Sequence, residues 1–235
     1  SADAIPDFAA LNEVLMPRTG WQVVAVPGLV PDEVFFNHLA NRRFPSGNFI
    51  RGADQLDYLQ EPDVFHDVFG HVPMLMHPVM ADFIQLYGQA GLRAQRIGKL
   101  TELARVYWYT VEFGLVKEQV QGASGAEEAL RIYGAGIASS FTESGFAVHS
   151  ASPNRIGFEL ERVMRTRYRI DDFQECYFVL DSLNDLLDLA RIDFDPVYER
   201  LNSGPTFAPG DVLPGDKVFQ RGDGAYVRGQ VPASV

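Results

Sequence analysis

The sequence predicts a mainly α-helical domain with a few short β-strands. Several long segments carry apolar residues at helical spacing, and proline followed by an acidic residue often stands where such a segment begins. Only residues 21–26 and 174–180 have the dense β-branched and aromatic composition of strands. Because there is no internal repeat or low-complexity block, we interpret residues 1–235 as a single domain with an irregular tail over about 205–235.

The N-terminal half is expected to contain one strand and three helices. The strand at 21–26 leads into a helix that begins near Pro31 and runs to about Arg43, since proline and an acid suit a first helical turn. Pro62 opens a second helix that has His66 in its interior, and Pro78 starts a third.

The C-terminal half is expected to continue this pattern. A helix over 99–112 has a buried face and can end at Gly114, whereas the polar residues 117–127 are predicted to be a mobile excursion. Two further amphipathic helices are expected on either side of the strand at 174–180. The two helices are expected over 153–168 and 181–192. Two possible short strands in the tail lie at 217–218 and 226–227.

Composition and charge exclude several classes of partner. The formal charge of -11 would repel phosphate backbones and anionic lipids, so we expect neither nucleic acid nor a membrane as a partner, and small molecules are favoured. No apolar run approaches the roughly 18 residues that would span a bilayer, and no secretory signal is present. Cys176 is the only cysteine, which excludes an internal disulfide and favours the cytoplasm. Any metal must therefore be held by histidines and carboxylates.

The segment 60–75 places His66 and His71 five residues apart in apolar surroundings, as an open transition-metal site requires. On a straight α-helix the two side chains would diverge by about 140°. Chelation of one ion therefore requires the helix to end or bend between them, and Gly70 and Pro73 stand where a break is needed. From the spacing alone, two helical histidines bonded to neighbouring polar groups are an equally good interpretation.

Glu112 is the candidate third ligand. It lies in the apolar string Y-W-Y-T-V-E-F-G-L, where an ionised carboxylate needs a cation, and Arg105 is too far along the helix for a direct pair. Two histidines and one carboxylate form the facial triad of non-haem Fe(II) oxygenases. The same residues could serve a zinc hydrolase with Asp67 as the base, or a non-enzymatic metal centre with His149 as a fourth ligand.

Three strings in the same order resemble those of one enzyme family. They are E-P-D-x-x-H-D-x-x-G-H-V-P, Y-W-Y-T-V-E-F-G-L and Y-G-A-G-I-A-S-S, and the sequence is similar to the pterin-dependent aromatic amino acid hydroxylases, in particular bacterial phenylalanine hydroxylases, from about Pro6 to Asp195. The resemblance implies a single catalytic domain of that family. It also implies an oxidoreductase that uses Fe(II), a tetrahydropterin and O2 to hydroxylate the ring of phenylalanine to tyrosine.

The resemblance assigns residues to this expected site. His66, His71 and Glu112 would hold Fe(II), and Arg51 would bind the substrate carboxylate, a bidentate task that suits a guanidinium. Without the family, Arg51 would be read as a solvated surface residue. The other expected substrate contacts are Tyr58, Leu59, Pro62, Trp108, Phe113, Gly136 and Ser139. The expected pterin contacts are Gly28, Val30, Asp32, Phe35, Asp67 and Tyr107, with Phe35 stacking on the pterin.

The substrate and the oligomeric state are narrower expectations. Ile170 and Trp108 favour phenylalanine, whereas Ser46, Gly47 and Asn48 depart from the family pattern and leave tryptophan or meta hydroxylation as alternatives. The sequence has no regulatory domain before the catalytic domain and no long heptad tail, so a monomer is expected. An N-terminal extension typical of the bacterial members is expected to be missing.

Overall fold

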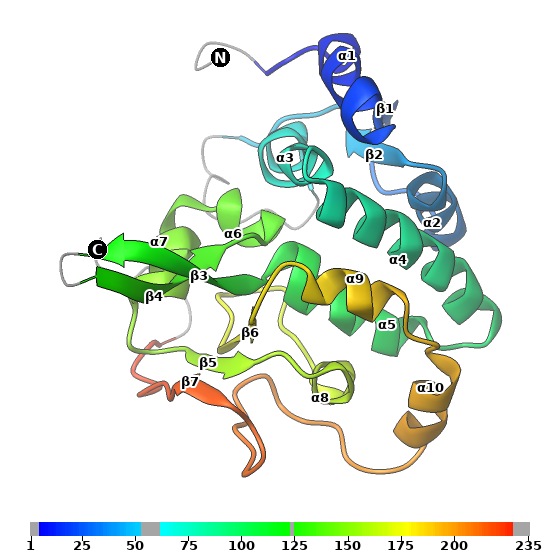
Figure 1. Cartoon of the computed structure of the whole chain (residues 1–235). Helices are drawn as coiled ribbons and strands as arrows, with labels where there is room; N and C mark the ends of the chain where they lie inside the picture. Colours follow the sequence, from blue (N-terminus) through cyan, green and yellow to red (C-terminus); the bar gives the residue numbers. More distant parts are fainter. Residues whose placement is uncertain (1–4, 53–61, 123–124, 228–235) are drawn as a thin grey trace. The chain divides into compact units, whose positions relative to one another are not determined.

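A computed structural model describes residues 5–52, 62–122 and 125–227 (Figure 1). The contacts between residues divide the chain into two compact units, Ser1–Leu103 with Leu186–Ile192, and Ala104–Asp185 with Asp193–Val235. Each unit is described by itself. The organisation of residues 1–235 as one domain stays a prediction, while the mainly helical fold class is confirmed.

The first unit consists of helices around a two-stranded parallel sheet. Strands β1 and β2 pair with Gln22 opposite Arg43 and Val26 opposite Gly47. The elements are α1 (Phe8–Thr19), β1 (Gln22–Val26), α2 (Asp32–Ala40), β2 (Arg43–Gly47), η2 (His66–His71), α3 (Val72–Leu75), α4 (Pro78–Arg96) and most of α9 (Asp185–Ala190). Among the described residues no helix is both long and apolar enough to cross a membrane.

Helix α2 packs closely against α4 because two glycines of α4 face it. A Cβ atom on Gly91 would lie 2.0 Å from the ring of Phe36, and one on Gly88 would lie 2.4 Å from the backbone nitrogen of Ala40. The prediction that this helix continues to about Arg43 is wrong. It ends at Ala40, and Arg42 adopts a left-handed conformation with a φ of 53° that turns the chain into β2.

The second unit contains a five-stranded mixed sheet in the order β4-β3-β6-β5-β7. Strand β6 lies in the middle, pairs in parallel with β3 and β5, and is buried along its whole length, as expected of a central strand. Helix α5 (Leu100–Tyr107) crosses from the first unit into the second. The other elements are η3 (Trp108–Glu112), β3 (Leu115–Gly122), β4 (Gly125–Ile132), α6 (Ala135–Ala138), α7 (Phe141–His149), β5 (Asn154–Gly157), α8 (Leu160–Arg165), β6 (Cys176–Leu180), α10 (Asp195–Leu201) and β7 (Val218–Gln220).

The predicted mobile excursion over 117–127 is wrong. The described residues of this range, 117–122 and 125–127, belong to the antiparallel hairpin of β3 and β4, in which Leu115 faces Ile132 at one end and Gly122 faces Gly125 at the other. The polar composition reflects exposure of the hairpin, whose charged side chains form ion pairs across the strands. Lys117 bonds Glu128 at 3.0 Å and Arg131 bonds Glu118 at 2.7 Å.

The predicted helix over 153–168 is also wrong in its first half. Residues Asn154–Gly157 form β5 because they pair with β6 on one side and β7 on the other, a tertiary contact that outweighs local helical periodicity. Helix α8 begins only after Glu159, whose carboxylate accepts hydrogen bonds from two backbone N–H groups of its first turn. The tail forms β7 near the first predicted strand, whereas residues 226–227 form none.

Candidate metal centre

His66 and His71 lie on one face of η2, a short π-helix in the first unit. In a π-helix the backbone hydrogen bonds join residues five apart, so residues five apart stack above each other. The N–H of Val72, the residue after η2, follows this pattern and donates to the carbonyl of Asp67. The expected end or bend at Gly70 is therefore wrong, because π winding continues through Gly70 and brings the imidazoles together without a break.

The two imidazoles converge closely enough to share an ion. Their Nε2 atoms are 2.9 Å apart, and the rings lie 4.7 Å apart at 80° to each other. Two nitrogens about 2.1 Å from a metal and at about 90° to each other would be separated by about 3.0 Å. The observed separation therefore fits two adjacent positions of one coordination sphere, and both histidines are buried.

The ring of His71 is supported by a residue of β2. Phe44 lies 4.9 Å from it at a tilt of 32°, and both side chains are about 2% exposed. This apolar contact holds the ring of His71 in place beside that of His66.

Asp63 begins the helical segment that carries these histidines. Its Oδ1 accepts a hydrogen bond from the backbone N–H of His66 at 2.9 Å, and its carboxylate also receives the Arg51 guanidinium at 2.8 and 3.0 Å. The Arg51 side chain is 7% exposed and that of Asp63 is fully buried, so Arg51 is no solvated surface residue. Burial raises the pKa of Asp63, but the hydrogen bonds from Arg51 and His66 outweigh it and leave the pKa below its ordinary value.

Asp67 links η2 to the end of β2. Its Oδ2 accepts a hydrogen bond from the backbone N–H of Gly47 at 2.8 Å, and the residue is 4% exposed. Gly47 also lies close to the segment before η2, since a Cβ atom there would be 3.2 Å from the carbonyl oxygen of Pro62. The acid that follows the first histidine is thus held in place by backbone.

Glu112 is the last residue of η3, a π-helical turn in the second unit. The N–H of Phe113 donates to the carbonyl of Trp108 at 2.8 Å, five residues back, and the Thr110 hydroxyl donates to the Val106 carbonyl. The tight approach of the next chain segment fixes this turn, because a Cβ atom on Gly134 would lie 2.3 Å from the Glu112 carbonyl oxygen.

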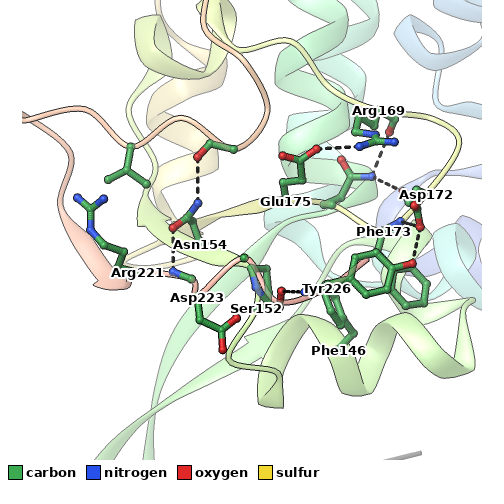
Figure 2. A pocket seen from close by; sticks show the side chains of 16 residues that line it. Phe146, Ser152, Asn154, Arg169, Asp172, Phe173, Glu175, Arg221, Asp223 and Tyr226 are labelled. Carbon is green, nitrogen blue, oxygen red and sulfur yellow. Dashed lines mark hydrogen bonds and ion pairs between the residues drawn. The ribbon is translucent and has the colours of Figure 1, made fainter. Parts of the chain in front are cut away.

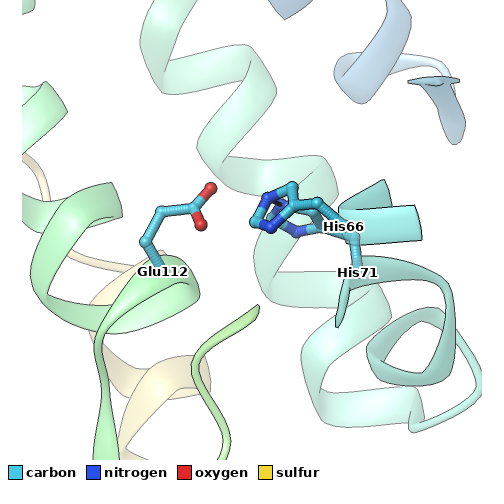
Figure 3. Close-up of side chains that lie close together, drawn as sticks. All are labelled: His66, His71 and Glu112. Carbon is cyan, nitrogen blue, oxygen red and sulfur yellow. Dashed lines mark hydrogen bonds between the residues drawn. The ribbon is translucent and has the colours of Figure 1, made fainter. Parts of the chain in front are cut away.

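Arg105, the alternative partner of Glu112, has a different role. Its Nη1 donates to the carbonyl oxygen of Met164 at 2.6 Å. His66, His71 and Glu112 together offer two imidazole nitrogens and one carboxylate oxygen, a candidate ligand set for one metal ion that does not include His149. Figure 3 draws the three side chains, with both imidazoles from η2 and the carboxylate from the end of η3. This donor set fits Fe(II) or Zn(II).

Trp108 and Phe113, two of the expected substrate contacts, touch each other in the second unit. Their rings are 4.7 Å apart, and the indole of Trp108 also stacks on Tyr168 at 4.3 Å and 15°. Gly136 leaves room for Phe113, since a Cβ atom there would be 2.8 Å from its ring. Ser139 ends α6 and is buried.

The expected pterin contacts are spread over several elements. Gly28 and Val30 lie in the loop between β1 and α2, and Asp32 is the first residue of α2. Phe35 is half-buried on α2, with its ring 5.5 Å from that of Phe36. Tyr107 ends α5 in the second unit.

Some expected residues cannot be compared with the structure. Tyr58 and Leu59 lie outside the described residues, whereas Pro62 is described and exposed. Three buried residues next to the expected contacts did not emerge from the sequence: Asp63 as the partner of Arg51, and Gln174 and Glu143 near Trp108. The position of Asp63 beside Pro62 at a helix start could have indicated its role. No feature of the sequence indicates the roles of Gln174 and Glu143.

Comparison with known proteins places the chain in a family. A sequence model described as biopterin-dependent aromatic amino acid hydroxylase matches residues 1–194. The chain belongs to this family. The phenylalanine-4-hydroxylases of Ralstonia nicotianae and Caulobacter vibrioides are each 61% identical over 222 residues, which is 94% of this chain and 68% and 73% of those proteins. The family and its pterin dependence were thus predicted correctly from the three strings.

Solved hydroxylase structures resemble this one closely. The phenylalanine hydroxylase of Chromobacterium violaceum bound to cobalt has a TM-score of 0.85 and 56% identity, covering 93% of this chain and 76% of that one. The structure of the same enzyme with iron and phenylalanine has a TM-score of 0.83 and 53% identity over the same shares. The mainly helical hydroxylase fold is therefore confirmed.

Proposed function

We propose that this pterin-dependent hydroxylase converts L-phenylalanine to tyrosine with O2, a tetrahydropterin and Fe(II). The observation that carries the proposal is the 2.9 Å convergence of the His66 and His71 Nε2 atoms on a buried π-turn, in a chain of this family. Its relatives with 55 to 61% identity are named phenylalanine-4-hydroxylases, and one related structure contains iron and phenylalanine.

His66, His71 and Glu112 are proposed as the iron ligands. Fe(II) held by these residues would, together with a tetrahydropterin, supply the activation of O2. Burial of both histidines limits the access of water to η2. Either His66→Ala or Glu112→Ala should abolish iron binding, measured as iron retained after gel filtration, while His149→Ala should retain it.

Arg51 is proposed to bind the carboxylate of the amino acid substrate. Asp63 accepts two hydrogen bonds from the guanidinium, so the plane of the guanidinium is fixed before substrate arrives. A preorganised guanidinium loses little conformational entropy on binding a carboxylate, which favours affinity.

The substrate ring is proposed to lie against the apolar residues of the second unit. Trp108 and Phe113 would form this wall, and Gly136 keeps the Phe113 ring in place because a larger residue would collide with it. Ser139, Pro62, Tyr58 and Leu59 complete the proposed substrate contacts. A wall of fixed rings orients the substrate for attack on one carbon.

The pterin is proposed to bind the backbone of the loop after β1, with Phe35 stacking on it. Gly28, Val30 and Asp32 belong to this loop and the start of α2, and Asp67 and Tyr107 are further proposed contacts. Because Asp67 already accepts the Gly47 N–H, its contact with pterin is expected to be bridged by water.

One experiment tests this function against its rivals. The protein is loaded with Fe(II) or Zn(II) and given O2, tetrahydropterin and either phenylalanine, tyrosine or tryptophan, and the products are identified by mass and ring position. We expect para-hydroxylated phenylalanine with iron only. A tryptophan or meta product would change the substrate assignment, and an iron-loaded protein without any pterin-dependent product would overturn the function and leave a zinc hydrolase or a non-enzymatic metal protein.

We further propose that the enzyme acts as a cytoplasmic monomer. The charge of -11 supports the absence of nucleic-acid and membrane partners. The lone Cys176 is fully buried in β6, and burial raises its pKa, as suits an inert structural thiol. Light scattering of the purified protein should give a mass near 26.2 kDa.

A further inference from the structure

Gln174 holds the indole of Trp108 by a hydrogen bond that no expected role of either residue includes. The side chain is 2% exposed, and its Oε1 accepts from the indole Nε1 at 2.9 Å. Its Nε2 donates to the backbone carbonyl of Arg169 at 3.1 Å and lies 3.4 Å from that of Asp172. Because carbonyl oxygens only accept, the amide nitrogen must face them, and Oε1 must face the indole. The amide thus has one satisfied orientation.

The backbone of Gln174 is anchored in turn by Glu143. The Gln174 N–H donates to Glu143 Oε1 at 3.3 Å, and the Tyr177 hydroxyl donates to the same oxygen at 2.7 Å. Glu143 is 6% exposed and lies in the first turn of α7, where the Ser140 hydroxyl oxygen accepts its backbone N–H. The start of α7 is therefore tied to the segment that carries Gln174.

These contacts fix the indole of Trp108 in two ways. Stacking on Tyr168 at 4.3 Å and 15° sets the plane of the ring, but stacked rings can still rotate within that plane. The hydrogen bond to Gln174 removes this rotation because it accepts the single N–H of the indole. Trp108 is also the first residue of η3, the turn that ends in Glu112.

We propose that Gln174, anchored by Glu143, is a positioning residue that sets the orientation of Trp108 and thereby the place of the aromatic substrate. The proposal rests on the proposed function, since it needs Trp108 to contact the substrate ring. An indole free to rotate would let the ring shift relative to the reacting centre. Substrate binding would weaken, and more tetrahydropterin would be oxidised without hydroxylation of the amino acid.

Gln174 is also one of the residues that line a cavity of about 500 Å³. Figure 2 shows that polar side chains of its lining bond one another, as Arg169 does with Glu175 at 2.9 Å and Asp172 with Tyr226 at 2.6 Å. We therefore assign no ligand to the cavity. Because Gln174 lines this cavity, a shorter side chain at position 174 would let water from the cavity reach the indole.

Kinetics of three variants test the proposal. Gln174→Met should raise the KM for phenylalanine by about 3- to 10-fold, the range expected for one net hydrogen bond, and lower the amount of tyrosine formed per tetrahydropterin oxidised. In a Trp108→Phe background the same change should add almost nothing, because the partner is gone. A full effect of Gln174→Met in that background would overturn the proposal.

Conservative and control variants separate positioning from stability. Gln174→Asn keeps both the donor and the acceptor of the amide on a side chain one methylene shorter, and it should leave the KM closer to that of the wild type than Gln174→Met does. Gln220→Met removes a different amide of the second unit. The side chain of Gln220 is half-buried, accepts a hydrogen bond from Arg155 and donates one to the Ser150 carbonyl. This substitution should lower Tm without changing the KM. An equal KM change in Gln220→Met would refute a specific role of Gln174.

Tryptophan emission gives a readout that needs no turnover. The chain has two tryptophans, and fully buried Trp21 contributes the same background to every variant. Gln174→Ala should shift the emission to longer wavelength as water reaches Trp108, while Gln220→Met should not. If the wild-type protein makes no hydroxylated product, the proposed function fails, but the emission still tests whether Gln174 controls the surroundings of Trp108. If the wild-type protein is active and neither the KM nor the emission changes in the Gln174 variants, the positioning role of Gln174 fails and the proposed function stands.

Discussion

Arg51 is the residue on which amino acid binding is expected to depend most. We predict that Arg51→Ala raises the KM for phenylalanine by more than about 10-fold, since charge-assisted bidentate hydrogen bonds are among the strongest in proteins. The KM of Arg51→Lys should fall between those of the wild type and Arg51→Ala, because lysine keeps the charge and loses the planar pair of donors. Steady-state kinetics at saturating pterin measure both, and an unchanged KM for Arg51→Ala would exclude the carboxylate role.

The same change should also affect stability. Asp63 stays fully buried after Arg51→Ala and loses the guanidinium that compensates its charge, so Tm should fall. Arg131→Ala is the matched control, because Arg131 and Glu118 form an exposed pair worth at most about 1 kcal/mol. Kinetics of both variants should be recorded well below their Tm.

The buried carboxyl of Glu143 should make the free energy of unfolding depend on pH. Burial raises its pKa from an ordinary 4.5 to about 7, with a further contribution from the charge of Asp172, against the hydrogen bonds from Tyr177 and the Gln174 N–H. The folded state therefore keeps the proton up to about pH 7, whereas the unfolded chain releases it near 4.5. The stability from this proton is complete below pH 4.5 and is lost as the pH rises to about 7.

A comparison with Glu143→Gln isolates this effect. The unfolding free energy of the wild type minus that of the variant should decrease by about 3 kcal/mol between pH 4.5 and 7, which corresponds to the raised pKa of one carboxyl. Urea denaturation at a series of pH values measures the difference. Parallel curves for the two proteins would show that Glu143 titrates normally.

At the scale of elements, the sequence indicates the need for a special geometry without specifying it. Two ligands five residues apart require either a bend or a π-turn, and both satisfy the same spacing. The π-turn of η2 depends on contacts from elsewhere in the first unit, such as Phe44 against His71 and Gly47 against Asp67. A single sequence does not reveal such contacts.

The difference between local sequence pattern and contacts from distant residues also explains which helices and strands were predicted. Helix α4 and strand β6 have their own periodic or apolar pattern, so the start of α4 at Pro78 and the approximate bounds of β6 were predicted. Strands β2 and β5 and the hairpin of β3 and β4 exist because another strand pairs with them. Their residues alone resemble a helix end, an amphipathic helix and a polar loop, so the local pattern gave the wrong element.

The turn that carries Glu112 offers a test with a matched pair of glycines. In Gly134→Ala the new methyl group would lie 2.3 Å from the Glu112 carbonyl oxygen, a backbone atom that cannot move cheaply. We expect a loss of about 1 to 3 kcal/mol in stability and weaker iron binding. Denaturant titration and iron content measure the two effects.

Gly145 is the control because it lies within α7 with open space around it. Gly145→Ala should stabilise the protein by about 0.5 to 1 kcal/mol through helix propensity and leave iron content unchanged. Equal effects of the two substitutions would contradict the close approach at Gly134.

At the scale of the whole molecule, the family and the candidate ligand set could be predicted because each lies in contiguous strings of the sequence. The partners that orient the site could not, since Asp63 and Arg51 are 12 residues apart and Gln174 and Trp108 are 66 apart. Pairs of this kind depend on the folded chain. The strings therefore identify the chemistry, and the fold supplies the positioning.

Iron should stabilise the molecule as a whole. A ligand that binds only the folded state adds about 2.7 kcal/mol at 100 times its Kd, so Fe(II) should raise Tm and a chelator should reverse the rise. Anaerobic calorimetry with and without Fe(II) measures the shift, and His66→Ala should abolish it. A shift that persists in His66→Ala would place the stabilising ion elsewhere.

Asp63 has a consequence for how this protein tolerates mutation. One carboxylate caps the segment of His66 and also holds Arg51, so a change at position 63 would disturb a proposed metal ligand and the proposed substrate-binding arginine in a single step. A genetic screen for loss of metal and another for loss of amino acid affinity should both recover this position. A second substitution that compensates at only one of the two partners should therefore not restore the enzyme.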